Sequence, residues 1–257
     1  MRGCMSGQRG GAGLTLNGLA KPGARLEPGS GVMLYRDEKI EDLQCGGLRI
    51  IVRRDGFHYG TDSVLLANFA KARSGGHIVE LCSGSGAVSI LLSAKTRASG
   101  ITGVEINEAL AEMSNRSAEM NGIGGRGNFI CGDIRNIKKI MGAGSACAVA
   151  VNPPYFTRGS GPCGPDENAA AARREIECNL YDVAGAADWL LGPGGLFYIV
   201  YRPDRLVDLF YVMRGIGIEP KEIQPAGASA EKPPSLVLVK GKKGAAPGLR
   251  YLNPIIT

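Results

Sequence analysis

A polar residue followed by two prolines and two aromatic residues is the stretch with the clearest chemical meaning. The apolar run 147–151 is typical of a buried strand, and Asn152, Pro153, Pro154, Tyr155 and Phe156 come directly after it. Proline lacks a backbone N–H and fixes φ, so the strand ladder must end there. We therefore expect the Asn152 amide to face outward from a strand tip, with Tyr155 beside it.

This arrangement suits the binding of a flat amino group, such as the exocyclic amine of adenine. The Asn152 side-chain oxygen and the Pro153 carbonyl can each accept one of its two hydrogens, which favours a more pyramidal and more nucleophilic nitrogen. Tyr155 or Phe156 can stack on the base, which is worth about 1–3 kcal/mol. The same residues also suit a simple strand end, so the upstream sequence has to decide between the two interpretations.

The upstream sequence contains a strand, a glycine turn and a helix in that order. The run 77–82 predicts a strand, Gly84 and Gly86 a tight turn, and the run 87–95 a helix. Glycine is needed where the backbone passes close to a ligand, and this unit is typical of nucleotide-binding α/β folds. The next predicted strand, 101–105, ends in Glu105, about 20 residues on, where a carboxylate can bind ribose hydroxyls.

A further acid follows the third predicted strand. After a helix at 107–121 and a strand at 128–131 comes Asp133, which can accept a hydrogen bond from an adenine amine. Dinucleotide sites usually need a third glycine where this chain has Ser89, so the pattern favours S-adenosylmethionine (SAM) over a nicotinamide cofactor. Because ligands of open α/β sheets bind at the carboxyl edge, we expect a SAM site next to Asn152.

Taken together, the ordered motifs resemble those of class I SAM-dependent methyltransferases, in the branch that methylates planar nitrogens. The segments that carry this likeness are 80–86, Glu105, 132–133 and 152–155. Three further segments, 57–69, 172–176 and 201–206, resemble the bacterial tRNA(Val) adenine-N6 methyltransferases, which modify the adenine 3′ of the anticodon. The resemblance runs from Met33 to the C-terminus. It departs at Cys82, where a glycine is usual, and at Arg174, where relatives often carry His.

The resemblance implies an α/β, Rossmann-like fold with a seven-stranded, mostly parallel sheet and helices on both faces. It implies that the catalytic residues are Asn152, Pro153, Pro154 and Tyr155. The SAM-binding residues that it implies are Thr61, Asp62, Glu80, Cys82, Gly84, Gly86, Glu105, Ile106, Asp133, Ile134 and Asn152. Among these, Thr61 and Asp62 would close the site near the methionine, and one of them would also be the N-cap of an apolar helix at 64–70.

Composition limits the class of protein. The chain has 257 residues, 44% hydrophobic and 21% charged, with seven cysteines that form no C-x-x-C pair. We therefore expect a cytoplasmic enzyme without a metal, a disulfide framework, a signal sequence or a membrane span. Of the net charge of +6, residues 1–32 carry +3, from four basic residues and one acid. The remaining net charge of +3, on residues 33–257, is compatible with an RNA substrate, most simply tRNA. We expect a monomer or weak dimer.

The expected organisation has three parts. Residues 1–32 form a disordered glycine-rich extension, residues 33–75 a segment that packs on the core, and residues 76–257 the methyltransferase domain. The long connection 157–172 is either a lid that becomes ordered when the substrate binds or a loop that only joins its two neighbouring elements.

Three other functions stay open. A protein glutamine N5-methyltransferase shares the motif, although residues 1–55 lack the helical pattern expected of such enzymes. A DNA or rRNA amino-methyltransferase shares the chemistry. A non-catalytic SAM-binding adaptor would be expected to have lost Asn152 or Tyr155, and both are present.

Overall fold

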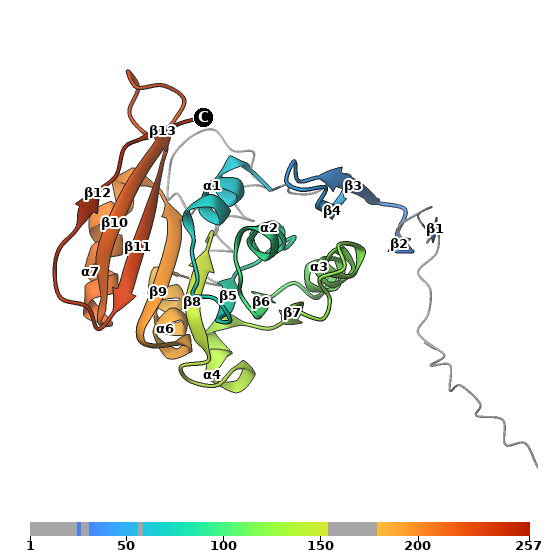
Figure 1. Cartoon of the computed structure of the whole chain (residues 1–257), viewed down its shortest axis with the longest axis horizontal. Helices are drawn as coiled ribbons and strands as arrows, with labels where there is room; N and C mark the ends of the chain where they lie inside the picture. The colour runs from blue at the N-terminus through green and yellow to red at the C-terminus, as the bar shows by residue number, and fades with distance from the viewer. Residues whose placement is uncertain (1–24, 27–30, 56–58, 154–178) are drawn as a thin grey trace, which may run out of the picture.

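The structure is a computed structural model that describes residues 25–26, 31–55, 59–153 and 179–257 (Figure 1). Its centre is one sheet whose long strands are β5 (His77–Leu81), β6 (Gly100–Glu105), β7 (Gly127–Cys131), β8 (Ala146–Val151), β9 (Leu191–Tyr201), β10 (Ile218–Gly227) and β11 (Leu236–Lys243). Their order across the sheet is β7-β6-β5-β8-β9-β11-β10, and among them only β11 is antiparallel to its neighbours.

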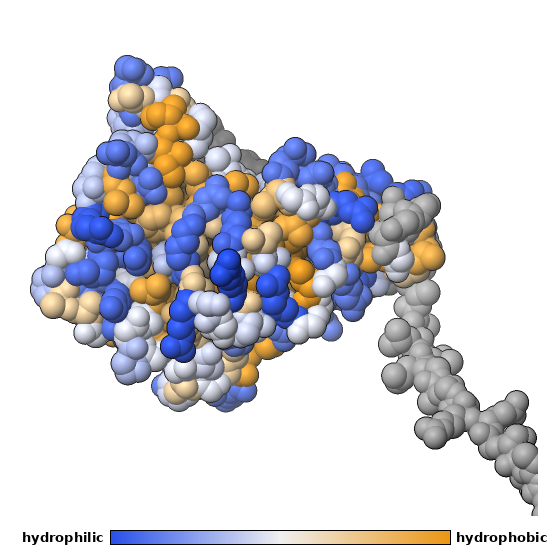
Figure 2. All heavy atoms as spheres, in the orientation of Figure 1, coloured by the Kyte–Doolittle hydropathy of each residue, from blue (hydrophilic) through white to orange (hydrophobic). Residues whose placement is uncertain are grey.

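The sheet confirms the predicted seven strands and adds two short ones. Strands β12 (Arg250–Tyr251) and β13 (Ile255–Ile256) pair with β10 in parallel. Each is two residues long, which is too short for an alternating pattern of hydrophobicity to reveal it in the sequence. Figure 2 shows strongly hydrophilic residues over this end of the sheet.

Helices cover both faces of the sheet. One face carries α1 (Thr61–Phe69), α2 (Ala87–Lys95) and α3 (Glu108–Met120), and the other carries α4 (Ile137–Ile140), α6 (Leu180–Leu190) and α7 (Leu206–Gly215). The 3₁₀ turns η1 (Ile134–Asn136) and η2 (Pro203–Arg205) precede α4 and α7. Because strand side chains alternate, Ala148 and Ala150 join the apolar cluster of α1 and α2, whereas Val149 and Val151 join that of α6 and α7.

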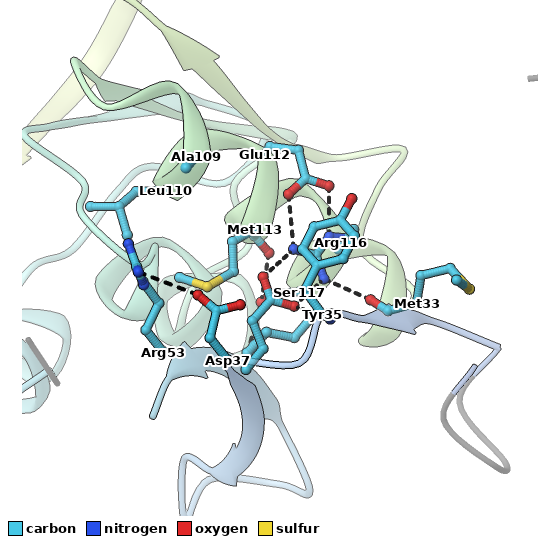
Figure 3. Close-up of polar contacts among 12 residues, drawn as sticks. Met33, Tyr35, Asp37, Arg53, Ala109, Leu110, Glu112, Met113, Arg116 and Ser117 are labelled. Atoms are coloured by element: carbon cyan, nitrogen blue, oxygen red, sulfur yellow. Dashed lines mark hydrogen bonds and ion pairs between the residues drawn. The ribbon is translucent and has the colours of Figure 1, made fainter. Parts of the chain in front are cut away.

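The N-terminal hairpin of β3 (Glu38–Asp42) and β4 (Arg49–Arg53) docks on α3 (Figure 3). The Arg116 guanidinium binds both oxygens of Glu38, at 2.6 and 2.7 Å, and both oxygens of Glu112, at 2.7 and 2.8 Å. It also donates to the Met33 carbonyl at 2.6 Å and lies 4.5 Å from the centre of the Tyr35 ring. This half-buried cation therefore holds the hairpin to α3, together with the hydrogen bonds of Ser117 and Asn121 to β4.

Within the first 32 residues, which the sequence predicts to be disordered, the structure describes a short pairing. Strand β1 (Arg25–Leu26) pairs antiparallel with β2 (Met33–Leu34), and Val32 is buried. The rest of that prediction falls on residues outside the described ranges.

Three searches of the described residues give negative findings. None of their helices is both long and apolar enough to cross a membrane. No group of three or more potential ligands for a metal ion occurs among them. Four cysteines in these ranges, Cys45, Cys82, Cys131 and Cys147, are free thiols.

Candidate active site at the carboxyl edge

Strand register brings the predicted site residues together. Leu81 pairs with Val104 on one side and with Val151 on the other, so the next residue of each strand lies at the same level of the sheet. These residues are Glu105, the last residue of β6, and Cys82 and Asn152, which directly follow β5 and β8. Adjacent strands are about 4.8 Å apart, which puts Asn152 one strand from the glycine turn and about 10 Å from Glu105.

The Asn152 side chain is held by the first turn of α1. Its Nδ2 donates to Asp62 Oδ2 at 2.9 Å and to Ser63 Oγ at 3.2 Å. A carboxylate can only accept, so the atom facing Asp62 has to be nitrogen rather than oxygen. Because the amide is planar, its oxygen points away from α1. The hydrogen bonds therefore fix which of the two possible amide orientations this half-buried side chain adopts.

The predicted cap of α1 was wrong. The N-cap is Gly60, which has no side chain, and Thr61 and Asp62 are the first two helical residues. Asp62 uses Oδ1 to accept from the Ser63 N–H at 2.8 Å and Oδ2 to accept from Asn152. Its carboxylate thus satisfies one free helical N–H while it links the helix to β8. Thr61 is exposed at the start of the helix.

The glycine turn has the backbone that such a site requires. Gly84 and Gly86 both have positive φ, 53° and 81°. A Cβ on Gly86 would lie 2.6 Å from the Phe129 ring, whereas a Cβ on Gly84 would meet nothing within 4 Å. Gly84 therefore borders open space at the sheet edge. Cys82 also has a positive φ, 55°, which is unfavourable for a residue with a side chain.

Glu80 is buried beneath this turn, and no cation among the described residues forms an ion pair with it. Its Oε2 accepts from the Ser89 N–H at 2.9 Å and from the Ser89 hydroxyl at 2.5 Å. Burial raises the pKa of the Glu80 carboxyl to about 8, while the Ser89 hydrogen bonds lower it and the charge of Glu105 raises it further. Ser89 stands where dinucleotide sites have their third glycine, and in this structure it donates two hydrogen bonds to Glu80.

Glu105 is fixed at the end of β6 by two backbone groups. Its Oε2 accepts from the Gly84 N–H at 2.8 Å and its Oε1 from the Asn107 N–H at 2.9 Å. Each carboxylate oxygen has two lone pairs, so both oxygens keep acceptor capacity for a pair of hydroxyls. The nearby Ser83 hydroxyl is buried and has no hydrogen-bond partner among the described residues.

Asp133 has a local partner that the sequence did not indicate. Its carboxylate accepts from the Arg135 side chain, with a shortest contact of 2.6 Å, and from the Arg135 N–H at 2.9 Å. The bond to the Arg135 side chain lowers the pKa of Asp133. Of the two predicted apolar neighbours, Ile106 is 50% exposed beside the site, whereas Ile134 is 6% exposed and packs in the core.

The structure leaves part of the predicted site undescribed. Pro154, Tyr155, Phe156 and the connection 157–172 lie outside the described residues, as does Arg174. Pro153 is described and buried.

The sequence analysis did not predict two contacts at this edge, that of Ser63 with Asn152 and that of Arg135 with Asp133. The signal for Ser63 was present, because it is the third polar residue in a row at the mouth of a helix. Its partner, however, is 89 residues away in the chain.

The described residues fit SAM by the chemistry of their groups. The ribose hydroxyls of SAM need hydrogen-bond acceptors, which Glu105 supplies. The methionine part of SAM needs polar groups beside a backbone that carries no side chain, which the turn at Gly84 supplies. The buried Ser83 hydroxyl, which has no partner among the described residues, lies in the same turn.

Sequence comparison finds relatives that match part of the chain, although no family model matches it. A Porphyromonas gingivalis protein named tRNA1(Val) (adenine(37)-N6)-methyltransferase is 29% identical over 156 residues, which are 58% of this chain and 60% of that protein. A Bacteroides fragilis protein of the same name is 29% identical over 145 residues, 56% of this chain and 60% of that protein. The chain thus spans about 60% of the length of these curated relatives.

A relative with another substrate covers more of the chain. The Streptomyces pristinaespiralis 4-amino-L-phenylalanine/4-methylamino-L-phenylalanine methyltransferase is 27% identical over 198 residues, 75% of this chain and 60% of that protein.

Several solved structures with the same fold are named as methyltransferases. An Agrobacterium tumefaciens protein described as an O-methyltransferase has a TM-score of 0.62 at 20% identity, covering 76% of this chain and 86% of that one. TrmN from Thermus thermophilus has a TM-score of 0.52 at 16% identity, covering 70% and 48%. The strand order, the antiparallel β11 and these neighbours together establish the class I methyltransferase fold, which is Rossmann-like.

Proposed function

We propose that this protein is a SAM-dependent methyltransferase that methylates the exocyclic N6 of an adenine in RNA, most simply in a tRNA next to the anticodon. The observation that carries the proposal is the Asn152 amide, which Asp62 and Ser63 hold one strand away from the glycine turn. The curated relatives named as tRNA adenine-N6 methyltransferases support the same substrate. A cytoplasmic location follows from such a substrate.

In this proposal SAM supplies an electrophilic methyl group, and the chain supplies position and polarity. Glu105 binds the ribose hydroxyls, and the Gly84 turn admits the methionine part, with Glu80 near its amino end. Asp133 accepts from the cofactor adenine amine while it stays bound to Arg135. The fixed Asn152 oxygen and the Pro153 carbonyl accept the two hydrogens of the target amine, so that its lone pair faces the methyl group. Pro154 and Tyr155, outside the described residues, complete this clamp.

No strong general base is needed for this reaction. The amine becomes nucleophilic because its two hydrogens are bound in a fixed direction, and positioning and polarisation together lower the barrier. The target adenine has to leave its stack to reach the edge, which costs a few kcal/mol.

The Streptomyces relative favours a second candidate, a small aromatic amine as substrate. An arylamine also has a nitrogen lone pair that is delocalised into a ring, so the same clamp can bind it, and this relative covers 75% of the chain.

One experiment separates these candidates. The protein is incubated with labelled SAM and, in parallel, with tRNA, rRNA, DNA, total protein and 4-amino-L-phenylalanine, and the products are identified by mass spectrometry. The proposal predicts N6-methyladenosine in tRNA and none with the Asn152→Ala variant. Label only in 4-amino-L-phenylalanine would establish the second candidate, and label in protein glutamine would contradict both.

A further inference from the structure

A second pocket lies on the β10–β11 end of the sheet, away from the glycine turn. It has a volume of about 390 Å³. Four basic side chains line it, Lys221, Lys240, Lys242 and Arg250, with Glu222 as its one acid. These residues come from β10, β11 and β12, where Figure 2 shows strongly hydrophilic residues.

The pocket opens on the same face of the sheet as α1. Leu238 of β11 belongs to the apolar cluster of α1 and α2, and side chains alternate along a strand, so Lys240 and Lys242 continue that face. A Cβ on Gly194 would lie 3.7 Å from Lys242 Cε, and a Cβ on Gly248 would lie 3.3 Å from Lys221 Nζ. The two lysines therefore each lie beside a glycine, and Lys242 is exposed whereas Lys221 is half-buried.

The charges of the pocket do not cancel. Glu222 accepts from Lys240 Nζ at 3.2 Å and also from Arg250 Nη2. Although burial alone would raise the pKa of Glu222, these two cations lower it, so it stays ionised at neutral pH. Lys221 donates to the Ala246 carbonyl at 2.9 Å, which neutralises no charge. Four cations and one carboxylate leave a net charge of +3, which suits an anion.

Strand register gives the distance from this pocket to the proposed site. Lys240 pairs with Tyr198, and Tyr198 pairs with Ala150, two residues before Asn152. With about 3.3 Å per residue and 4.8 Å per strand, the Lys240 Cα is about 12 Å from that of Asn152. Lys242, at the level of Ala148, is about 16 Å away by the same spacing. The straight line between these points passes beneath α1, whose Phe69 packs against Tyr198, so an RNA strand that joins them has to pass around this helix.

We propose that this pocket binds a backbone phosphate of the RNA whose adenine enters the Asn152 site. This proposal rests on the proposed function for its ligand, and it deepens it by adding a second contact on the same polymer. Phosphate contacts position a nucleic acid and are independent of its sequence. The pocket therefore sets the register of the RNA strand, while the sheet edge selects the base.

The test measures RNA binding without methyl transfer. The variant Lys242→Glu/Arg250→Glu reverses two charges of the pocket and leaves Lys240, the more buried partner of Glu222, in place. A matched control, Arg97→Glu/Lys139→Glu, makes the same change at exposed positions next to α2 and on α4. Binding of a labelled tRNA is followed by fluorescence anisotropy at several salt concentrations, and SAM binding by calorimetry.

We expect the pocket variant to bind tRNA at least tenfold more weakly, with a salt slope smaller by about 1 to 2 because each lost phosphate contact removes about one. The control variant should stay within threefold of the wild type, and both should bind SAM as the wild type does. A third variant, Glu222→Gln, removes the negative charge and keeps a hydrogen-bond acceptor, so it should tighten tRNA binding several-fold.

Equal loss in the pocket variant and the control, or no loss in either, overturns the pocket as a phosphate site. Displacement of tRNA by poly-glutamate at the same charge concentration overturns RNA as its ligand. If the pocket variant loses tRNA binding while the wild type fails to methylate any RNA, the pocket stands and the proposed function falls.

Discussion

Two buried glutamates of this protein have opposite surroundings. Glu38, on the N-terminal hairpin, is 5% exposed, and Glu80, on the central strand β5, is 2% exposed. Glu38 forms a two-bond ion pair with Arg116. Arg116 also binds Glu112, and Figure 3 labels both of these residues. Within the described ranges, the hydrogen-bond donors to Glu80 are the backbone N–H and the hydroxyl of Ser89.

The difference separates a structural contact from a contact that we propose to serve SAM binding. At the hairpin each buried charge has an opposite charge in direct contact, so the network fixes the hairpin on α3. At the sheet edge no cation from the described part of the chain pairs with the Glu80 carboxyl, and its pKa is raised to about 8. Residues with strongly shifted pKa values in a site often serve function, and Glu80 lies under the turn proposed to bind SAM.

The largest expected effect is at the hairpin. Arg116→Met leaves Glu38 buried without its cation, which should lower the free energy of unfolding by about 3–5 kcal/mol, because an uncompensated buried charge is costly. Chemical denaturation measures this directly. The exposed pair of Arg214 and Glu219 is the control, and Arg214→Met should cost at most about 1 kcal/mol.

A double variant sharpens this prediction. Arg116→Met/Glu38→Met removes both charges of the pair, so it should be more stable than Arg116→Met alone. An Arg116→Met loss no larger than that of Arg214→Met would mean that the network contributes little and that the two glutamates do not differ as described.

A second effect, spread over a range of pH values, is expected at Glu80. Its pKa is about 8 in the folded protein and near the ordinary value of 4.5 in the unfolded chain, so only the folded state keeps the proton between these values. Stability from this group is fully present below pH 4.5 and is lost as the pH rises to about 8. The slope in this window is on the order of 1.4 kcal/mol per pH unit.

Glu80→Gln should remove that slope and make the protein more stable than the wild type at pH 8. Urea denaturation without SAM between pH 5 and 9 measures both. Glu119→Gln changes an exposed acid of α3 and should leave the slope as it is. If the unfolding free energy of the wild type and of Glu80→Gln changed equally with pH, the pH dependence would come from a group other than Glu80.

The smallest expected effect concerns backbone strain at the same two regions. Among the described residues other than glycine, Cys82 and Gln44 have positive φ, 55° and 52°. Cys82→Gly should stabilise the protein by about 0.5–1 kcal/mol, because relief of the left-handed strain exceeds the entropy lost by glycine. Gln44→Gly, in the turn between β3 and β4, is the matched variant, because Gln44 also has a positive φ. A loss of stability in Cys82→Gly would show that packing of the thiol outweighs the strain.

Local signals made much of the fold predictable. The helix at 87–95 follows a glycine turn and was predicted with the bounds that α2 has, because turn and apolar pattern adjoin in the sequence. Glu105 and Asn152 were placed on one edge by strand order alone, and the register confirms it. Such inferences succeed because parallel strands carry their ends to a common edge.

Contacts between distant segments were not predictable. Asp62 and Asn152 are 90 residues apart, and Glu38 and Arg116 are 78 apart. No periodicity or spacing links such pairs, since the fold alone brings them together. The cap of α1 was wrongly predicted for the same reason, because Asp62 faces both Ser63 and β8. The roles of Glu80, Glu105 and Asp133 toward SAM stay predictions.

The most direct test compares methyl transfer with SAM binding in Asn152→Ala. The account predicts a loss of kcat of at least about 100-fold, as when one oriented hydrogen-bond partner of a transition state is removed. It also predicts that the SAM dissociation constant, measured by calorimetry, stays within a few-fold of the wild type. An equal loss of transfer and of SAM affinity would contradict it, because Asn152 would then support the fold of the edge and not the target amine.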